Sequence, residues 1–223
     1  MTQDLYPWGV AELYPRMRDV IPEASIGDYR IEHFEVTERE ANHYSLFNMQ
    51  SYLARMMQAG KFCRLVRGSG WSQSVLMSDT HAERNTNEDV VRQAHGRVLL
   101  AGLGLGMIVC PIAKKPEVSE VVVVEISQEV IQLVEPPLRQ YLGKDADKLK
   151  IVHCDIFEYQ PEGKFSTIYF DIWGDYSGDE YPDTKTLHKK FRKFLNRTDN
   201  HFMDSWMRWD IKNRFFQNRR SYR

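Results

Sequence analysis

The chain has 223 residues and a mass of 26.3 kDa, with 42% hydrophobic and 27% charged residues. This composition excludes collagen-like, mucin-like and intrinsically disordered proteins. The length fits one main domain with a sizeable core and a smaller appendage, and the net charge of −1 by itself predicts neither a nucleic-acid nor a membrane partner.

Charge is unevenly distributed along the chain. Residues 185–223 contain 12 Lys and Arg against three acids, Asp199, Asp204 and Asp210, whereas residues 1–184 contain 18 basic and 28 acidic residues. A basic C-terminal segment on an acidic body indicates either a solvated helix face or a contact with an anion, a partner subunit or the acidic body itself.

Cysteine usage and the N-terminus predict a cytoplasmic protein. Cys63, Cys110 and Cys154 are widely spaced and form no metal-binding pattern, which predicts free thiols in a reducing compartment and no metal site. The first ten residues lack the basic and apolar regions of a signal peptide. The longest apolar run, residues 98–113, is too short to span a membrane.

The first 94 residues predict a helical and β-hairpin region. Three prolines in residues 1–28 predict short helices around turns, and residues 29–36 predict a strand. Thr37 and Glu40 form a capping box that opens a helix ending at Gly60. Residues 61–67 and 71–77 predict a hairpin around a Gly-Ser-Gly turn, followed by a helix over 82–94. The inner side of the helix that ends at Gly60 is predicted to carry Leu46, Phe47, Leu53, Met56 and Met57.

Residues 95–223 alternate between strand and helix patterns and predict a second region. Strands are expected at 97–101, 120–125, 150–153 and 167–171, with another around 200–203. Helices are expected at 107–114, 128–141, 184–196 and 203–216. Such alternation predicts an α/β fold with a parallel sheet joined by right-handed crossovers.

A glycine-rich turn follows the first of these strands directly. Gly102, Gly104 and Gly106 stand at alternate positions, which allows a tight backbone bend and close approach of a ligand. The dinucleotide fingerprint has the spacing GxGxxG, but its last position here is Met107, which argues against NAD or FAD.

Polar residues follow the next three strands. Glu125 ends the second strand, where its two oxygens can accept both ribose hydroxyls of a nucleoside. Asp155 follows the third strand and can accept from an exocyclic amine, while Ile126 and Ile156 can flank the ring. Asp171 follows the fourth strand. The carboxyl ends of parallel strands are where open α/β sheets bind ligands.

Together these residues resemble the S-adenosylmethionine site of class I methyltransferases, and most closely the spermidine synthase-like branch. That branch carries a GGGDGG turn, an acidic second strand end, a D-A-F motif and a D-S-S-D-P motif after an N-terminal β-hairpin. The resemblance covers residues 61–173 and implies a truncated Rossmann-like class I methyltransferase fold with S-adenosylmethionine as the cofactor. The implied cofactor-binding residues are Gly102, Leu103, Gly104, Gly106, Glu125, Ile126, Asp155, Ile156, Asp171 and Trp173.

Three departures from the branch affect the functional prediction. Leu105 replaces the acid of GGGDGG, which removes repulsion against an intact amino-acid tail and favours ordinary S-adenosylmethionine. The D-S-S-D-P position reads Asp171-Ile-Trp-Gly-Asp175, which makes polyamine recognition doubtful. The chain also ends 52 residues after Asp171, which predicts a shortened sheet and a homo-oligomer that covers the exposed edge or face.

Other residues admit two interpretations each. Trp173 can face a sulfonium or belong to the core. Asp79 and Glu83 can bind a substrate or the cofactor amine, or favour a helix N-terminus, and Asp175 and Tyr176 are further candidate substrate contacts. Trp206 and Trp209 predict the buried stripe of the last helix, with base stacking as the alternative.

The primary prediction is an S-adenosylmethionine-dependent transferase that methylates a small-molecule acceptor, with Asp171 as the catalytic base or electrostatic partner. The first alternative is attack on the propyl carbon, by aminopropyl transfer or internal cleavage, which releases methylthioadenosine. The second alternative is a non-catalytic nucleoside-binding or assembly module.

Overall fold

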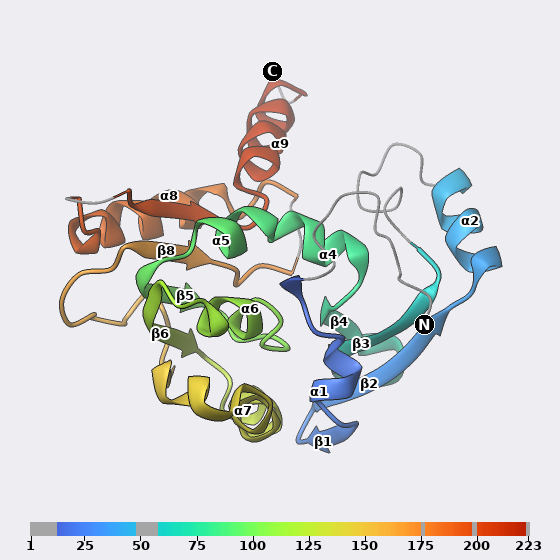
Figure 1. Ribbon diagram of the computed structural model, residues 1–223. Coiled ribbons are helices and arrows are strands. Elements are labelled where there is room, and N and C mark those ends of the chain that lie inside the picture. The colour runs from blue at the N-terminus through green and yellow to red at the C-terminus, as the bar shows by residue number, and fades with distance from the viewer. Residues whose placement is uncertain (1–12, 48–57, 175–176, 198–199, 222–223) are drawn as a thin grey trace.

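The computed structural model describes residues 13–47, 58–174, 177–197 and 200–221. These residues form two β-sheets, one antiparallel and one parallel, with helices packed around the parallel sheet (Figure 1). The α/β prediction with a separate N-terminal hairpin region is therefore confirmed.

The N-terminal sheet is antiparallel and has the order β1-β2-β3-β4. Its strands are β1 (Ala24–Ile26), β2 (Tyr29–Val36), β3 (Gly60–Arg67) and β4 (Ser74–Ser78). The predicted hairpin is β3–β4, with a short 3-10 turn, η2 (Gly70–Ser72), in the connection. The short helices predicted before residue 29 are represented in the described part by α1 (Met17–Val20), and the strand β1, which was not predicted, follows it.

The predicted capping box is present at the start of α2 (Glu38–Phe47), where the Glu40 carboxylate accepts hydrogen bonds from the Thr37 N–H and hydroxyl at 2.8 Å each. Of the apolar residues predicted for the inner side of this helix, Leu53, Met56 and Met57 lie outside the described residues. The helix predicted over 82–94 is instead two helices, α4 (His81–Thr86) and α5 (Glu88–Gln93). Asn87 separates them, since its φ and ψ of −105° and 4° are not helical.

The second sheet is parallel and has the order β7-β6-β5-β8-β9. Its strands are β5 (Gly96–Ala101), β6 (Val118–Glu125), β7 (Leu149–His153), β8 (Thr167–Phe170) and β9 (Phe202–Ser205). All four predicted strands and the extra strand near residue 200 are present. Strands β6 and β7 lie on one side of β5, and strands β8 and β9 lie on the other side. The strand order therefore reverses between β5 and β8, and open α/β sheets bind ligands in the crevice at such a point.

Helices cover both faces of the parallel sheet, because its central strands are apolar on both sides. Val98 and Leu100 of β5 pack in one core cluster, and Leu99 and Ala101 pack in the other. The first cluster is covered by α6 (Val109–Lys114), α7 (Gln128–Leu142) and the N-terminal sheet, and the second by α8 (Tyr181–Phe191). Two short 3-10 segments, η3 (Gly143–Lys148) and η4 (Arg192–Phe194), follow α7 and α8.

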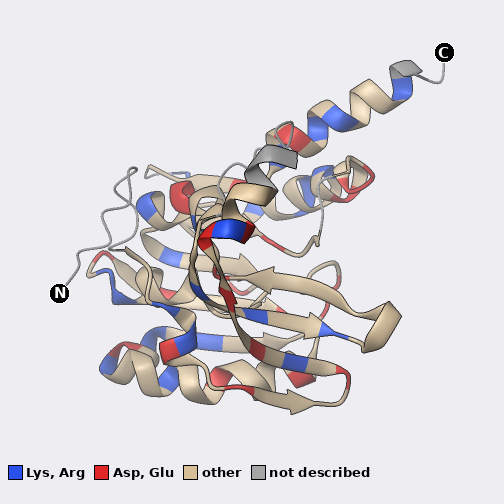
Figure 2. Cartoon of the chain, turned by 90° about the vertical axis from the view of Figure 1, so that its right-hand side faces the viewer, with Lys and Arg blue, Asp and Glu red and all other residues tan. Residues whose placement is uncertain are grey.

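The last helix, α9 (Arg208–Ser221), extends away from the body of the molecule and carries several basic side chains (Figure 2). The predicted stripe of two buried tryptophans is wrong in part. Trp206 is buried but precedes the helix, and Trp209 is 72% exposed. Within the described residues, no helix is long and apolar enough to cross a membrane.

Candidate functional site

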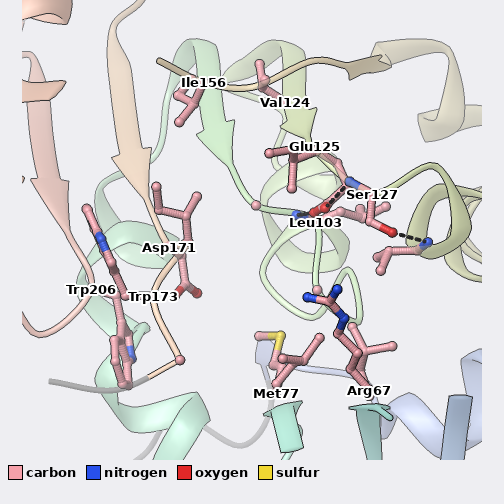
Figure 3. Close-up of a pocket in the computed structure, with 18 of the residues that line it drawn as sticks. Arg67, Met77, Leu103, Val124, Glu125, Ser127, Ile156, Asp171, Trp173 and Trp206 are labelled. Atoms are coloured by element: carbon pink, nitrogen blue, oxygen red, sulfur yellow. Dashed lines mark hydrogen bonds between the residues drawn. The ribbon is translucent and has the colours of Figure 1, made fainter. Parts of the chain in front are cut away.

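A pocket of about 420 Å³ lies at the carboxyl ends of β5, β6 and β8, between the two sheets. The parallel sheet contributes the glycine turn, Glu125 and Asp171, and the N-terminal sheet contributes Arg67 and Met77 (Figure 3). Side chains from segments far apart in sequence therefore meet in one crevice, at the place where the strand order predicts a ligand.

The glycine turn is packed against the rest of the protein on three sides. A Cβ on Gly102 would lie 2.1 Å from the Asp171 carbonyl oxygen, and one on Gly104 would lie 2.2 Å from Met77 Sδ. A Cβ on Gly106 would lie 2.8 Å from the Leu138 side chain, and Gly106 is not among the residues that line the pocket, so its predicted contact with a cofactor gains no support from this position. All three glycines have positive φ, which other residues rarely adopt.

Glu125 joins the ends of the first two parallel strands. One carboxylate oxygen accepts the Leu103 backbone N–H at 2.8 Å, and the other accepts the Ser127 N–H at 2.9 Å (Figure 3). Glu125 is only 8% exposed, yet it lines the pocket. Because a carboxylate oxygen has two lone pairs, each oxygen keeps one for a ligand. The group is thus fixed in place and suited to two hydroxyl donors.

The far side of the pocket combines one polar group with apolar walls. Asp155 accepts the Phe157 N–H at 2.8 Å through one oxygen, and its other oxygen has no partner among the described residues. Ile156 is buried, and Ile126 is 66% exposed at the opening. The two isoleucines predicted from sequence do line the pocket together with Asp155, an arrangement that can hold a flat, partly polar ring.

The opposite end of the pocket is acidic and aromatic. Burial raises the pKa of Asp171 to about 7. Burial, and then the negative charge of Asp171, raises the pKa of Glu83 to about 8, although the Ser78 N–H donates to it at 3.3 Å. Trp173 and Trp206 line the same end, and the Trp206 indole N–H donates to Thr86 Oγ1 at 2.9 Å. Carboxyls with pKa values near neutrality can take up or release a proton.

One of the predicted substrate contacts, Asp79, does not line the pocket. Asp79 is fully buried outside the pocket, where its oxygens accept the backbone N–H groups of Met17 and Cys63 and pair with Arg84 at 3.0 Å. Asp79 therefore links the start of α1 to the N-terminal sheet, and a substrate role for it is not supported. Asp175 and Tyr176 lie outside the described residues.

Leu105 also differs from its sequence-based interpretation. Its side chain is fully buried in the core, while its backbone N–H donates to Met77 Sδ at 3.3 Å. It does not line the pocket. The side chain therefore cannot set the electrostatic environment of a ligand, and the argument that leucine at this position favours an intact amino-acid tail is wrong.

The sequence analysis did not predict several of the lining residues, among them Arg67, Met77 and Trp206. The first two belong to the N-terminal sheet, whose approach to the glycine turn depends on tertiary packing. A local signal existed for Arg67, since it shares one strand face with the buried Leu65 at a spacing of two residues. Among the described residues, no group of three metal-ligating side chains is present.

No protein-family model matches the chain, and no curated protein matches its sequence. Solved structures match part of it. The DhpI-SAM-HEP complex has a TM-score of 0.41 and 15% identity over 54% of this chain and 51% of its own. The glycopeptide N-methyltransferase MtfA complexed with S-adenosyl-L-methionine has a TM-score of 0.41 and 20% identity over 53% of this chain and 52% of its own.

The N-methyltransferase NodS from Bradyrhizobium japonicum matches with a TM-score of 0.38 and 16% identity, over 51% of this chain and 62% of its own. The chain thus spans about half the length of the first two structures. Since these similarities are weak and partial, the fold class rests on the strand order given above and not on the matches.

Proposed function

We propose that this protein is an S-adenosylmethionine-dependent transferase that methylates a small-molecule acceptor. The observation that carries the proposal is the position of Glu125. Its buried carboxylate is held by two backbone N–H groups beside the glycine turn and retains lone pairs on the pocket side. A vicinal diol such as that of ribose matches this acceptor pair, since charge-assisted hydrogen bonds to hydroxyls are strong.

The remaining lining residues fit the other parts of such a cofactor. Asp155 has a free oxygen for an exocyclic amine, and Ile126 and Ile156 supply apolar surface for a purine. Trp173 and the carboxyls of Glu83 and Asp171 suit a positively charged sulfur or ammonium group. When bound, S-adenosylmethionine supplies an electrophilic methyl group on a sulfonium.

Asp171 is the proposed proton acceptor. It lies at the pocket end that carries no basic side chain among the described residues, and its pKa of about 7 suits proton exchange near neutral pH. The chain holds an acceptor molecule here, excludes water with Trp173 and Trp206, and takes a proton at the Asp171 carboxylate. Most of the rate enhancement in this proposal comes from positioning.

A second candidate function is attack on the propyl carbon, as in the branch that the sequence resembles. The observation in its favour is that the N-terminal sheet lines the pocket through Leu65, Arg67 and Met77. The two reactions differ in product, because methyl transfer leaves S-adenosylhomocysteine and attack on the propyl carbon leaves methylthioadenosine. A nucleoside-binding module without turnover would produce neither.

Calorimetry tests the cofactor proposal. Glu125→Ala is expected to weaken S-adenosylmethionine binding by about tenfold or more, because two charge-assisted bonds of about 1.5–3 kcal/mol each are lost. The same change leaves two backbone N–H groups without an acceptor, so Glu125→Gln serves as the milder variant. Glu120→Gln, on the same strand but paired with Arg97 outside the pocket, is the matched control. Unchanged affinity in both Glu125 variants contradicts the proposal.

Chromatography of the nucleoside product tests the reaction. We expect S-adenosylhomocysteine, formed about a hundredfold more slowly by Asp171→Asn if Asp171 takes the proton. Methylthioadenosine as the main enzyme-dependent product would favour the second candidate. Cofactor binding without either product, with cell extract as the source of acceptors, would favour the non-catalytic module.

A further inference from the structure

We propose that Arg67 binds the α-carboxylate of the cofactor's amino-acid tail, so that the pocket selects intact S-adenosylmethionine over its decarboxylated form. This inference rests on the proposed function, since it assigns one end of the cofactor to a residue of the N-terminal sheet. Arg67 thereby takes the selective role that the sequence analysis gave to Leu105, because the buried Leu105 side chain cannot contact the tail.

The Arg67 side chain lines the pocket from the end of β3. Arg67 ends β3 and pairs with Tyr29 of β2 and Ser74 of β4. It shares its strand face with Leu65, which also lines the pocket. Figure 3 shows the guanidinium rising from β3 toward the glycine turn, beside Met77. Arg64, three positions earlier, pairs with Glu32 and does not line the pocket.

The N-terminal sheet contacts the glycine turn directly. Met77 Sδ accepts the Leu105 N–H at 3.3 Å and lies against the Cα of Gly104. Because Met77 and Arg67 stand on adjacent paired strands, this contact fixes the end of β3 above the turn. Figure 3 shows the guanidinium between Met77 and the glycine turn at Leu103, with Asp171 on the other side of the pocket.

The Arg67 guanidinium forms no salt bridge with any residue that the structure describes. Its Cζ lies 5.5 Å from the centre of the Tyr29 ring, and its charge contributes, after hydrogen bonds from backbone N–H and from Ser127, to the lowered pKa of Glu129. Stacking on Tyr29 restrains the side chain but leaves the five N–H donors available. A guanidinium fork matches the two oxygens of a carboxylate.

The side chains that line the pocket are mostly acidic where they are ionisable. The described lining residues include four carboxyls, namely Glu83, Glu125, Asp155 and Asp171, and a single basic side chain, Arg67. The carboxyls suit the hydroxyl and cationic groups of S-adenosylmethionine. Its α-carboxylate would be repelled by all four, and Arg67 is the lining group that offsets this repulsion.

The test compares two ligands that share the adenosine half. S-adenosylhomocysteine carries the amino-acid tail, and methylthioadenosine lacks it. We expect Arg67→Gln to weaken binding of S-adenosylhomocysteine by about tenfold or more in calorimetry and to change binding of methylthioadenosine by less than about twofold. Arg64→Gln, on the same strand, is the matched control and is expected to change neither affinity. Thermal unfolding of each variant verifies that it is folded.

A second measurement needs no variant. The wild-type protein is expected to bind S-adenosylmethionine about tenfold or more tightly than decarboxylated S-adenosylmethionine, which is a difference of about 1.4 kcal/mol. Equal affinity for these two ligands, or equal loss of both nucleosides in Arg67→Gln, overturns the assignment of Arg67. Tighter binding of adenosine monophosphate than of S-adenosylhomocysteine also overturns it, in favour of a phosphate ligand. Failure to bind any adenosine thioether instead contradicts the proposed function itself.

Discussion

Asp171→Asn is expected to stabilise the fold, and to do so increasingly as the pH rises. Burial raises the pKa of the Asp171 carboxyl from 3.8 to about 7 in the folded protein. The unfolded chain therefore loses this proton at lower pH than the folded protein does. Between about pH 4 and pH 7 the folded state must retain a proton or hold a buried charge, so stability falls as the pH rises through this window.

The size of the effect follows from the shift in pKa. A difference of about three pKa units at about 1.4 kcal/mol each corresponds to a penalty of roughly 4 kcal/mol above pH 7, and of roughly 1–2 kcal/mol at pH 5. Asparagine has nearly the same shape and no charge, so Asp171→Asn removes the penalty. The pKa of Glu83 is raised by burial and then by the charge of Asp171. Asp171→Asn removes that charge, so the folded protein is stabilised further through Glu83.

Urea denaturation at pH 5, 6, 7 and 8 measures this prediction. The free energy of unfolding of Asp171→Asn minus that of the wild type should grow by roughly 2–3 kcal/mol from pH 5 to pH 8. Asp89→Asn changes an exposed acid on α5 and should give a curve parallel to the wild type. A constant difference at all four pH values would mean that Asp171 is solvated, and it would remove the argument for Asp171 as a proton acceptor near neutrality.

Three further predictions concern the fold and the assembly. Gly102→Ala should lower the free energy of unfolding by roughly 2–4 kcal/mol, because its Cβ would meet the Asp171 carbonyl oxygen at a φ of +94°, whereas Gly174→Ala, with open space at its Cβ, should cost far less. Light scattering should give a multiple of 26.3 kDa, since β9 is an edge strand and Trp209 is exposed, and a clean monomer would contradict this. Calorimetric unfolding should show one transition, since both sheets share a core cluster, and two separate transitions would refute that.

The sequence was sufficient to predict the parallel sheet because its signals are local. An apolar strand that runs into glycines, and an apolar strand that ends in Glu125, are both readable from neighbouring residues. Strand alternation then places their carboxyl ends along one edge, which brings Glu125, Asp155 and Asp171 into one pocket. The break at Asn87 was not predicted, since nothing in its immediate sequence separates two short helices from one longer helix.

The direction of side chains in the glycine turn could not be predicted from the same signals. Leu103 and Leu105 occupy similar sequence positions and belong to the same buried cluster, but Leu103 also lines the pocket and Leu105 does not. Their orientation depends on the positive φ values of Gly102, Gly104 and Gly106, and these follow from contacts with distant segments. Arg67 was missed for a related reason, because the hairpin reaches the turn only in the folded protein.

Two regions, with a boundary near residue 94, were predicted from the sequence. In the structure they contribute side chains to the same core cluster and to the same pocket. Ile31 and Leu65 of the N-terminal sheet belong to the same buried cluster as Val98 and Leu100 of β5. The pocket likewise has one wall from each sheet, with Met77 against the glycine turn. A change in the packing between the sheets would therefore move Arg67 relative to Glu125. For this reason the N-terminal sheet is a structural part of the candidate site, and ligand selectivity is expected to depend on the contact between the two regions.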